Sequence, residues 1–348
     1  MEWSRTLQMI EAHCEGEIGK VLTSGIIDIP GKTMQAKMQH INEVDNSLVS
    51  LCMYEPRGCA QMAVNLLLPP VNENADAGFI VLLSDGAHPM SGSNCICVVT
   101  VLLETGLLPI TGNEVTVMLD TPAGAISAKA TCVGQKCEKV TLDMPVAFLI
   151  EKDVEVEIDG AVSLKADIAF GGEFYALVDI ANLDIGITPD KAHLLAGLSY
   201  QIQQYLSRKL SIQHPLIPEL NKLNNVMFYE RLGETDFRTC TSGMSGRVDR
   251  SPCGTGSTAL FAKLFAEGLL GVDDTLHTRS IIDSRFTIYC REDIQNQALN
   301  GIQCELTGRA WIYGIHQLGI DRTDPFANGF VLSDTWGPFT DKLMTKSN

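Results

Sequence analysis

The chain has 348 residues, of which 45% are hydrophobic and 20% charged, a composition typical of a globular protein with two domains of ordinary size rather than of a disordered chain. Its formal net charge of −16 argues against a nucleic-acid partner or an anionic membrane surface, because phosphate binding needs clustered Lys and Arg. No apolar run approaches the ~20 residues that span a bilayer, and the first residues lack a signal-peptide pattern, so the eleven cysteines are expected to be reduced thiols of a cytoplasmic protein.

The first part of the chain alternates short apolar segments with one helical stretch. A strand is predicted over residues 6–10 and a helix over residues 33–46. The continuous apolar segments at 64–68 and 79–83 predict buried strands. From residue 113 to residue 148 the pattern is typical of β-structure, with turn residues between the segments 114–119, 128–132 and 137–142.

A second series of elements begins near residue 150. The segments 154–158 and 164–169 predict strands, and residues 191–210 predict a long helix. Further strands are expected at 225–230, 284–290 and 301–315. Residues 314–325 then lead back toward the first domain. We therefore expect one domain formed by residues 1–150 plus about 312–348 and a second formed by residues 151–311.

Two stretches of the chain mirror each other at a spacing of 162 residues. Gly92 aligns with Gly254, and both precede an apolar helical stretch that ends in Gly-Leu-Leu, at residues 106–108 and 268–270. In this alignment Ser91 matches Cys253. The agreement of turn, helix length and helix end predicts two similar halves, each with one nucleophilic or acid/base side chain at a helix N-terminus.

These patterns together predict an α/β (α+β) fold with two pseudo-symmetric domains. Each domain is expected to be a mixed β-sheet wrapped around a central helix, with the active site in the cleft between the domains. The spacing of the cysteines does not match a zinc site, and no metal is expected.

Several motifs give the chain a resemblance to a known family. They are Glu-Ala-His-Cys-Glu-Gly-Glu at 11–17, Ile-Pro-Gly-Lys-Thr-Met at 29–34, Glu-Pro-Arg-Gly at 55–58, Phe-Gly-Gly-Glu-Phe-Tyr-Ala at 170–176 and Asp-Arg-Ser-Pro-Cys-Gly-Thr-Gly at 249–256. In this order they resemble the cofactor-independent proline racemase family, which shares the fold of diaminopimelate epimerase. The resemblance implies a small imino-acid substrate and no cofactor, and it is compatible with a homodimer.

The first helix-start motif departs from the family pattern. Racemases and 4-hydroxyproline epimerases of the family usually have Met-Cys-Gly-His there, whereas this chain has Met90-Ser91-Gly92-Ser93. The chain resembles a Ser/Cys subgroup, which implies dehydration of trans-3-hydroxy-L-proline to Δ1-pyrroline-2-carboxylate, with some 2-epimerisation of hydroxyprolines. The alternatives are a 4-hydroxyproline 2-epimerase and a homologue that binds an imino acid without turnover.

The chemistry of these residues suits proton transfer at Cα. Ser91 and Cys253 are the predicted catalytic residues, one for each face of the carbon, and a helix N-terminus is expected to lower the thiol pKa. The backbone N–H groups of the dipeptides Gly92-Ser93 and Gly254-Thr255 are expected to bind the substrate carboxylate. Asp249 is expected to hold the substrate ammonium or hydroxyl group.

Each of these residues also has a purely structural interpretation. Cys253 could be an inert buried thiol, Ser91 a helix N-cap and Asp249 a turn residue. His88 either replaces the missing imidazole near Ser91 or is a surface residue. Two further alternatives stay open: a structural or catalytic role for His13, and a pocket wall or strand core for Phe170 and Tyr175.

Overall fold

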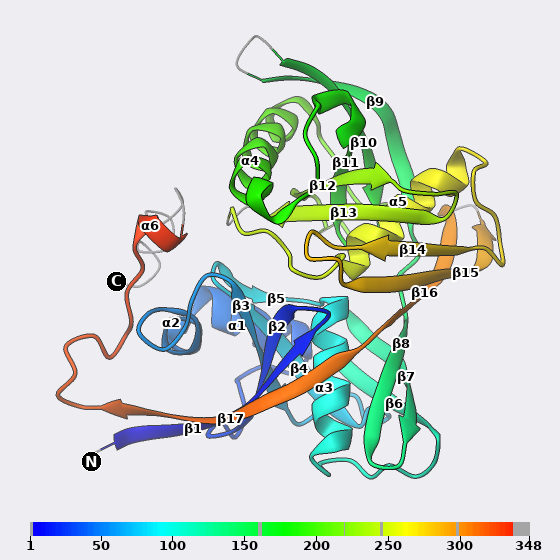
Figure 1. The fold of residues 1–348 in the computed structure, drawn as a ribbon. Helices are drawn as coiled ribbons and strands as arrows, with labels where there is room; N and C mark the ends of the chain where they lie inside the picture. The colour runs from blue at the N-terminus through cyan, green and yellow to red at the C-terminus, as the bar shows by residue number, and fades with distance from the viewer. Residues whose placement is uncertain (1–2, 159–161, 219, 244–245, 297–298, 337–348) are drawn as a thin grey trace. The chain divides into compact units, whose positions relative to one another are not determined.

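The computed structural model describes residues 3–158, 162–218, 220–243, 246–296 and 299–336. The chain forms two compact units (Figure 1). The first unit contains Met1–Leu142 and Gly308–Asn348, and the second contains Asp143–Thr307. The chain therefore passes from one unit to the other twice. Among the described residues, no helix is both long and apolar enough to cross a membrane.

The first unit is built on one mixed sheet. Its strands are β1 (Trp3–Cys14), β2 (Glu17–Ser24), β3 (Met62–Leu68), β4 (Ala77–Leu83), β5 (Gly86–His88), β6 (Glu114–Thr121), β7 (Gly124–Val133), β8 (Lys136–Asp143) and β17 (Ala310–Asp321). Hydrogen bonding gives the order β17-β1-β2-β3-β4-β6-β7-β8, and β5 pairs with the end of β4. The pairs β2–β3 and β4–β6 are parallel, and the other pairs are antiparallel.

Helices cover both faces of this sheet. The helices α1 (Met34–Glu43) and α2 (Ser47–Met53) share a hydrophobic core with Val64 and Leu66 of β3. The helix α3 (Gly92–Glu104) packs against β1, β2, β3, β7 and β17, and Asn65, which lies between Val64 and Leu66, contacts it. Every residue of α3 except the last is buried, as expected for a helix that is apolar on all sides. A short helix, α6 (Ser333–Trp336), follows β17.

The second unit repeats this arrangement. Its strands are β9 (Phe148–Ile158), β10 (Val162–Phe170), β11 (Phe174–Asp179), β12 (Leu223–Arg231), β13 (Asp236–Gly243), β14 (Thr275–Arg279), β15 (Arg285–Gln295) and β16 (Asn300–Gly308), in that order across the sheet. The pairs β11–β12 and β13–β14 are parallel. Val226 and Phe228 of β12 share a core with α4 (Ala192–Lys209), whereas Met227 lies against α5 (Gly254–Ala266).

The correspondence between the units extends to the strand that closes each sheet. The strands β1, β2, β3, β4, β6, β7 and β8 match β10 through β16 in order and direction. The strand β9, which precedes β10, is matched by β17, which comes from the end of the chain. The central helices also correspond, because α3 packs on β1, β2, β7 and β17 and α5 packs on β10, β11, β15 and β9. The predicted fold of two related mixed sheets, each around a central helix, is confirmed.

Some elements differ from those expected. The segment 301–315, which was expected to form one strand, belongs to two strands, β16 and β17, that meet at Arg309. The helix α2 and the strands β13 and β14 were not expected. The strand β13 has the sequence Asp-Phe-Arg-Thr-Cys-Thr-Ser-Gly, in which buried hydroxyl side chains replace the apolar residues by which a strand is recognised.

The two central helices end in the same way. Gly106 and Gly268 follow α3 and α5 with φ angles of +73° and +70°, the left-handed conformation that favours glycine at a helix end. Their N–H groups donate to the carbonyl groups of Leu103 and Phe265, at 3.2 and 2.9 Å. The predicted glycine stops of both helices are thus confirmed.

Replacing either glycine with alanine should test this conformational requirement. A Cβ atom at position 106 or 268 would have no neighbour within 4 Å, so backbone strain alone should lower the free energy of unfolding, by about 1 kcal/mol. The matched control is Gly197→Ala in α4, where the space is equally open but the conformation is helical, and where stability should rise by about 0.5–1 kcal/mol. Urea denaturation measures both, and destabilisation by Gly197→Ala as well would contradict the explanation.

Candidate active site

Ser91 lies at the N-cap position of α3, but its side chain does not cap the helix. The Ser91 hydroxyl makes no hydrogen bond to the first-turn backbone. Its Oγ atom instead accepts a hydrogen bond from the Asn94 side-chain amide at 3.0 Å and lies 3.2 Å from the Ser93 hydroxyl. Asn94 is held in turn by the Asn65 amide, which donates to the Asn94 carbonyl oxygen at 2.9 Å. A row of amides therefore supports the hydroxyl of Ser91.

Cys253 occupies the equivalent N-cap position of α5. Its φ angle of +66° is left-handed, a conformation that non-glycine residues seldom adopt and that is often found at functional sites. The side chain is 7% exposed. The Tyr175 hydroxyl lies 3.4 Å from the Cys253 sulfur and 2.6 Å from the Thr255 hydroxyl. The thiol is thus surrounded by two hydroxyl groups at the start of a buried helix.

The loop before α5 is fixed by its own polar side chains. One carboxylate oxygen of Asp249 accepts hydrogen bonds from the Ser251 N–H at 2.8 Å and the Ser251 hydroxyl at 2.9 Å. The Ser251 hydroxyl accepts from the Cys253 N–H at 3.2 Å. Thr239 and Ser257 donate to the carbonyl of Pro252 at 3.0 and 3.1 Å. Asp249 therefore does form a turn, and it also sets the backbone of the thiol residue.

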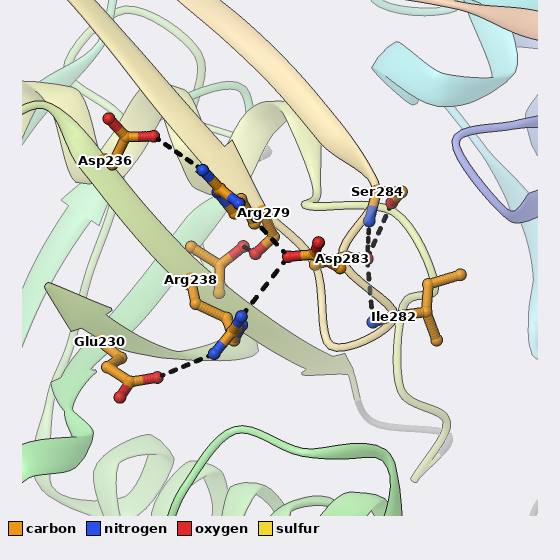
Figure 2. A network of polar contacts seen from close by, with 9 residues as sticks. Glu230, Asp236, Arg238, Arg279, Ile282, Asp283 and Ser284 are labelled. Atoms are coloured by element: carbon orange, nitrogen blue, oxygen red, sulfur yellow. Dashed lines mark hydrogen bonds and ion pairs between the residues drawn. The ribbon is translucent and has the colours of Figure 1, made fainter. Parts of the chain in front are cut away.

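The turn between β14 and β15, which contains Asp283 and Ser284, contacts this loop. The Ser284 hydroxyl donates to the Arg250 carbonyl at 3.4 Å. Figure 2 shows Asp283 of the same turn between two arginines, with its carboxylate 3.4 Å from Arg238 and 3.7 Å from Arg279. These ion pairs are partly exposed, and each contributes little alone, but together they connect the turn to β13 and β14.

Burial, and after it the charge of the Asp249 carboxylate, raise the pKa of the Cys253 thiol to about 12. The Tyr175 hydroxyl and the Gly256 N–H oppose this change. The expected lowering of the thiol pKa by the helix N-terminus is therefore not met, because removal from water outweighs the effect of the helix. Cys253 is therefore a thiol at neutral pH, even though the guanidinium of Arg247 interacts electrostatically with both Asp249 and Cys253.

Both helix starts present N–H groups that have no partner within the helix. The first four N–H groups of an α-helix have no partner within the helix, and they carry partial positive charge. In α3 these groups include those of Gly92 and Ser93, and in α5 those of Gly254 and Thr255. Each half thus combines a proton-carrying side chain with donors suited to a carboxylate.

Apart from Tyr175, the histidine and aromatic candidates contact other residues of the fold. The His88 imidazole lies 2.9 Å from the carboxylate of Asp85. The His13 ring accepts a hydrogen bond from the Gly16 N–H and stacks on Trp311 at 5.3 Å between ring centres. Phe170 belongs to the hydrophobic core of the second unit, whereas Tyr175 reaches Cys253. Neither the role of Asn94 nor that of Ser251 was predicted, because short polar residues in a turn carry no distinctive sequence signal.

The chain is similar to known proteins over nearly its whole length. The family model described as "Proline racemase" matches residues 9–331 of the chain. The chain is 40% identical over 339 residues to the 4-hydroxyproline 2-epimerase of Allorhizobium ampelinum, covering 97% of this chain and 98% of that protein. It is 39% identical over 340 residues to the 4-hydroxyproline 2-epimerase of Agrobacterium fabrum, with 97% and 99% covered.

Solved structures give the same result. A hydroxyproline epimerase from Agrobacterium vitis, solved with bound trans-4-OH-L-proline, superposes with a TM-score of 0.92 at 40% identity and covers 98% of this chain and 99% of its own. A probable proline racemase from Agrobacterium radiobacter K84, solved with bound carbonate, gives a TM-score of 0.90 at 39% identity, with 97% and 99% covered.

The influence of Asp249 on the thiol can be measured directly. Because the Asp249 carboxylate raises the pKa of Cys253, Asp249→Asn should move the pH profile of Cys253 alkylation by iodoacetamide toward lower pH. Peptide mass spectrometry separates this modification from that of Cys59, the one cysteine that is only partly buried. Asp236→Asn, in the network of Figure 2, is the control and should leave the profile in place. An upward movement in Asp249→Asn would contradict the electrostatic explanation.

Proposed function

Because the chain belongs to the proline racemase family, we propose that it is a 4-hydroxyproline 2-epimerase that uses Cys253 and Ser91 to move a proton at Cα. The observation that carries the proposal is the 40% identity, over nearly the whole chain, to proteins with that activity in their names. The sequence motifs alone favoured dehydration of trans-3-hydroxy-L-proline, and these relatives instead favour the isomerase. The presence of a buried thiol at a helix start supports both reactions.

In the proposed reaction, one of the two side chains removes the Cα proton and the other supplies a proton to the opposite face. The charge that develops spreads into the carboxylate, so the enzyme must stabilise an enediolate-like anion. The N–H groups at the starts of α3 and α5 are donors of the required kind. Hydrogen bonds from these N–H groups become stronger as negative charge builds up on the carboxylate. They therefore stabilise the transition state more than the bound substrate, as catalysis requires.

The substrate itself can activate the thiol. Cys253 carries its proton at neutral pH because of burial and the charge of Asp249. An ammonium group bound at Asp249 would offset that negative charge and add a cation close to the sulfur, and both changes favour the thiolate. Activation would thus depend on a substrate with a ring ammonium. This assigns Asp249 the role of binding the ring nitrogen.

Ser91 is the weaker acid/base of the two side chains. A serine hydroxyl is a far weaker acid than a thiol, and its alkoxide is correspondingly hard to form. The amide of Asn94 donates to its oxygen at 3.0 Å, so the remaining lone pair and the hydroxyl proton are directed elsewhere. We therefore expect proton transfer at the face of Ser91 to be slower than at the face of Cys253.

A second candidate function is dehydration of trans-3-hydroxy-L-proline. The pair Ser91 and Ser93 favours it, because this pair replaces the thiol and imidazole that a two-base racemase of the family has at these positions. In that substrate the 3-hydroxyl and the Cα–H lie on one face of the ring. One group could therefore take the proton and pass it to the leaving hydroxide, with no strong base needed on the other face.

An assay in deuterated water followed by NMR separates the two functions. With trans-4-hydroxy-L-proline we expect inversion at Cα with deuterium incorporated there, and Cys253→Ala should lower the rate by at least about a thousandfold, because removing a catalytic nucleophile or base leaves only binding effects. Ser251→Thr, which keeps the hydroxyl that supports the loop, is the control. Imine formation from trans-3-hydroxy-L-proline without epimerisation of the 4-hydroxy substrate would replace the first function with the second.

The identity of residue 91 should set the balance between the two reactions. Ser91→Cys restores a proton carrier of thiol acidity, so epimerisation of 4-hydroxyproline should rise, by about tenfold or more, and any dehydration should not rise with it. Both rates are measured on the same protein with the two substrates. A fall in epimerisation would show that the Ser91 hydroxyl is itself the optimised proton carrier.

A further inference from the structure

In each unit a polar side chain forms a hydrogen bond with the proposed acid/base residue, but it comes from a different element in each. In the first unit the amide of Asn94 in α3 donates to Ser91, and in the second the hydroxyl of Tyr175 in β11 lies 3.4 Å from the Cys253 sulfur. We propose that Asn94 and Tyr175 are equivalent positioning residues that stabilise the deprotonated forms of Ser91 and Cys253. The proposal rests on the proposed function, because it assigns roles to those two side chains.

The second unit shows the arrangement most clearly. Tyr175 is 2% exposed, and its hydroxyl lies between the Cys253 sulfur at 3.4 Å and the Thr255 hydroxyl at 2.6 Å. A thiolate can only accept hydrogen bonds. When Cys253 is deprotonated, Tyr175 therefore donates to the sulfur and accepts from Thr255. Burial raises the pKa of Tyr175 well above its ordinary value, so the phenol keeps its proton while it donates.

The space for Tyr175 exists because the helix has a glycine beside it. A Cβ atom at Gly256 would lie 3.1 Å from the Tyr175 ring, 3.2 Å from the Cys253 sulfur and 2.4 Å from the end of the Met227 side chain. The Met227 side chain would have to move, and the contacts with the ring and the sulfur would be closer than most Cβ contacts in proteins. Gly256 therefore admits the tyrosine ring to the start of α5.

In the first unit the arrangement is reversed: the glycine lies on the strand and the polar residue lies on the helix. The strand β2 has Gly19, where a Cβ atom would lie 2.8 Å from the Asn94 carbonyl oxygen and 3.3 Å from the Asn65 amide. The helix carries the donor, Asn94, whose amide reaches Ser91. Asn65 is fully buried and keeps the Asn94 side chain in this orientation.

The strand registers show that these positions are equivalent. Gly19 pairs with residue 63 in the parallel pair β2–β3, and Tyr175 pairs with residue 225 in the parallel pair β11–β12. Asn94 and Gly256 are the third residues of their helices. A strand residue and a helix residue thus meet at the same point in both units. One of the two is glycine and the other supplies the donor.

Both donors act on the same chemical state. A hydrogen bond to an anionic acceptor is stronger than one to its neutral form, so an amide near the Ser91 oxygen and a phenol near the Cys253 sulfur each favour loss of the proton. Both also fix the side-chain rotamer at the helix start. Each donor thus acts through a hydrogen bond to the residue that carries the proton.

Thiol alkylation tests the proposed roles of Tyr175 and Asn94 without requiring that the protein convert a substrate. For the second unit, Tyr175→Phe keeps the ring and removes the donor, and the pH profile of Cys253 alkylation should move up by about one unit, as expected for a lost hydrogen bond to a charged group. Tyr229→Phe, a buried tyrosine of the neighbouring strand β12, is the control and should leave the profile unchanged.

For the first unit, the thiol is introduced at position 91. In a Ser91→Cys, Cys253→Ala background, Asn94→Leu removes the amide while nearly keeping its volume, and the alkylation profile of the new thiol should also move up by about one unit. Thr100→Val, which removes a buried hydroxyl from the same helix, is the control. Asn94→Ala is the second variant, and circular dichroism confirms that each protein is folded before its profile is compared.

The outcomes separate this proposal from the proposed function. A shift of the alkylation profile to higher pH in both the Tyr175 and the Asn94 variants supports it, whether or not the protein converts 4-hydroxyproline. An unchanged profile in Tyr175→Phe, or in both folded Asn94 variants, overturns it even if the enzyme is an epimerase. In an active enzyme, Tyr175→Phe should lower kcat by about tenfold with KM nearly unchanged, and a rise in KM alone would indicate a binding role instead.

Discussion

The start of a buried helix is the feature on which both halves of this protein depend. A helix that is enclosed by a sheet keeps several N–H groups that the helix itself cannot satisfy, and leaving such groups unpaired away from water is costly. Burial of α3 and α5 is secured by apolar side chains on all sides. The fold therefore produces two places where an anion is favoured, and the chain puts Ser91 and Cys253 there.

Burial also works against the chemistry at the same point. It raises the pKa of Cys253, and Asp249 adds to the effect. The groups that oppose it are local hydrogen-bond donors, the Tyr175 hydroxyl and the Gly256 N–H. The backbone of Cys253 is held in a left-handed conformation, which is maintained by the hydrogen bonds of Ser251 and of the Pro252 carbonyl. Stability of the surrounding sheet thus offsets local strain and the cost of a buried reactive group.

Much of this was predictable because it depends on strong local signals. The repeat at 162 residues was visible because glycine is needed at the left-handed helix ends, and the apolar pattern of α3 and α5 showed that both are buried. The strand β13 was missed because hydroxyl residues fill its buried side. The contact between Tyr175 and Cys253 could not be derived from spacing, since it joins a strand and a helix start 78 residues apart. The high thiol pKa was also missed, because a motif indicates a helix N-terminus but not the extent of burial around it.

The two halves have kept the fold and diverged in the side chains around the helix start. In one half the space between helix and strand is filled from the helix by Asn94, and in the other it is filled from the strand by Tyr175. An amide is a modest donor matched to a hydroxyl, and a buried phenol is a stronger one matched to a thiol. The same packing position can accept either arrangement, because only one of its two residues can be large. The chemical asymmetry between Ser91 and Cys253 is therefore accompanied by an asymmetry in the residues that support them.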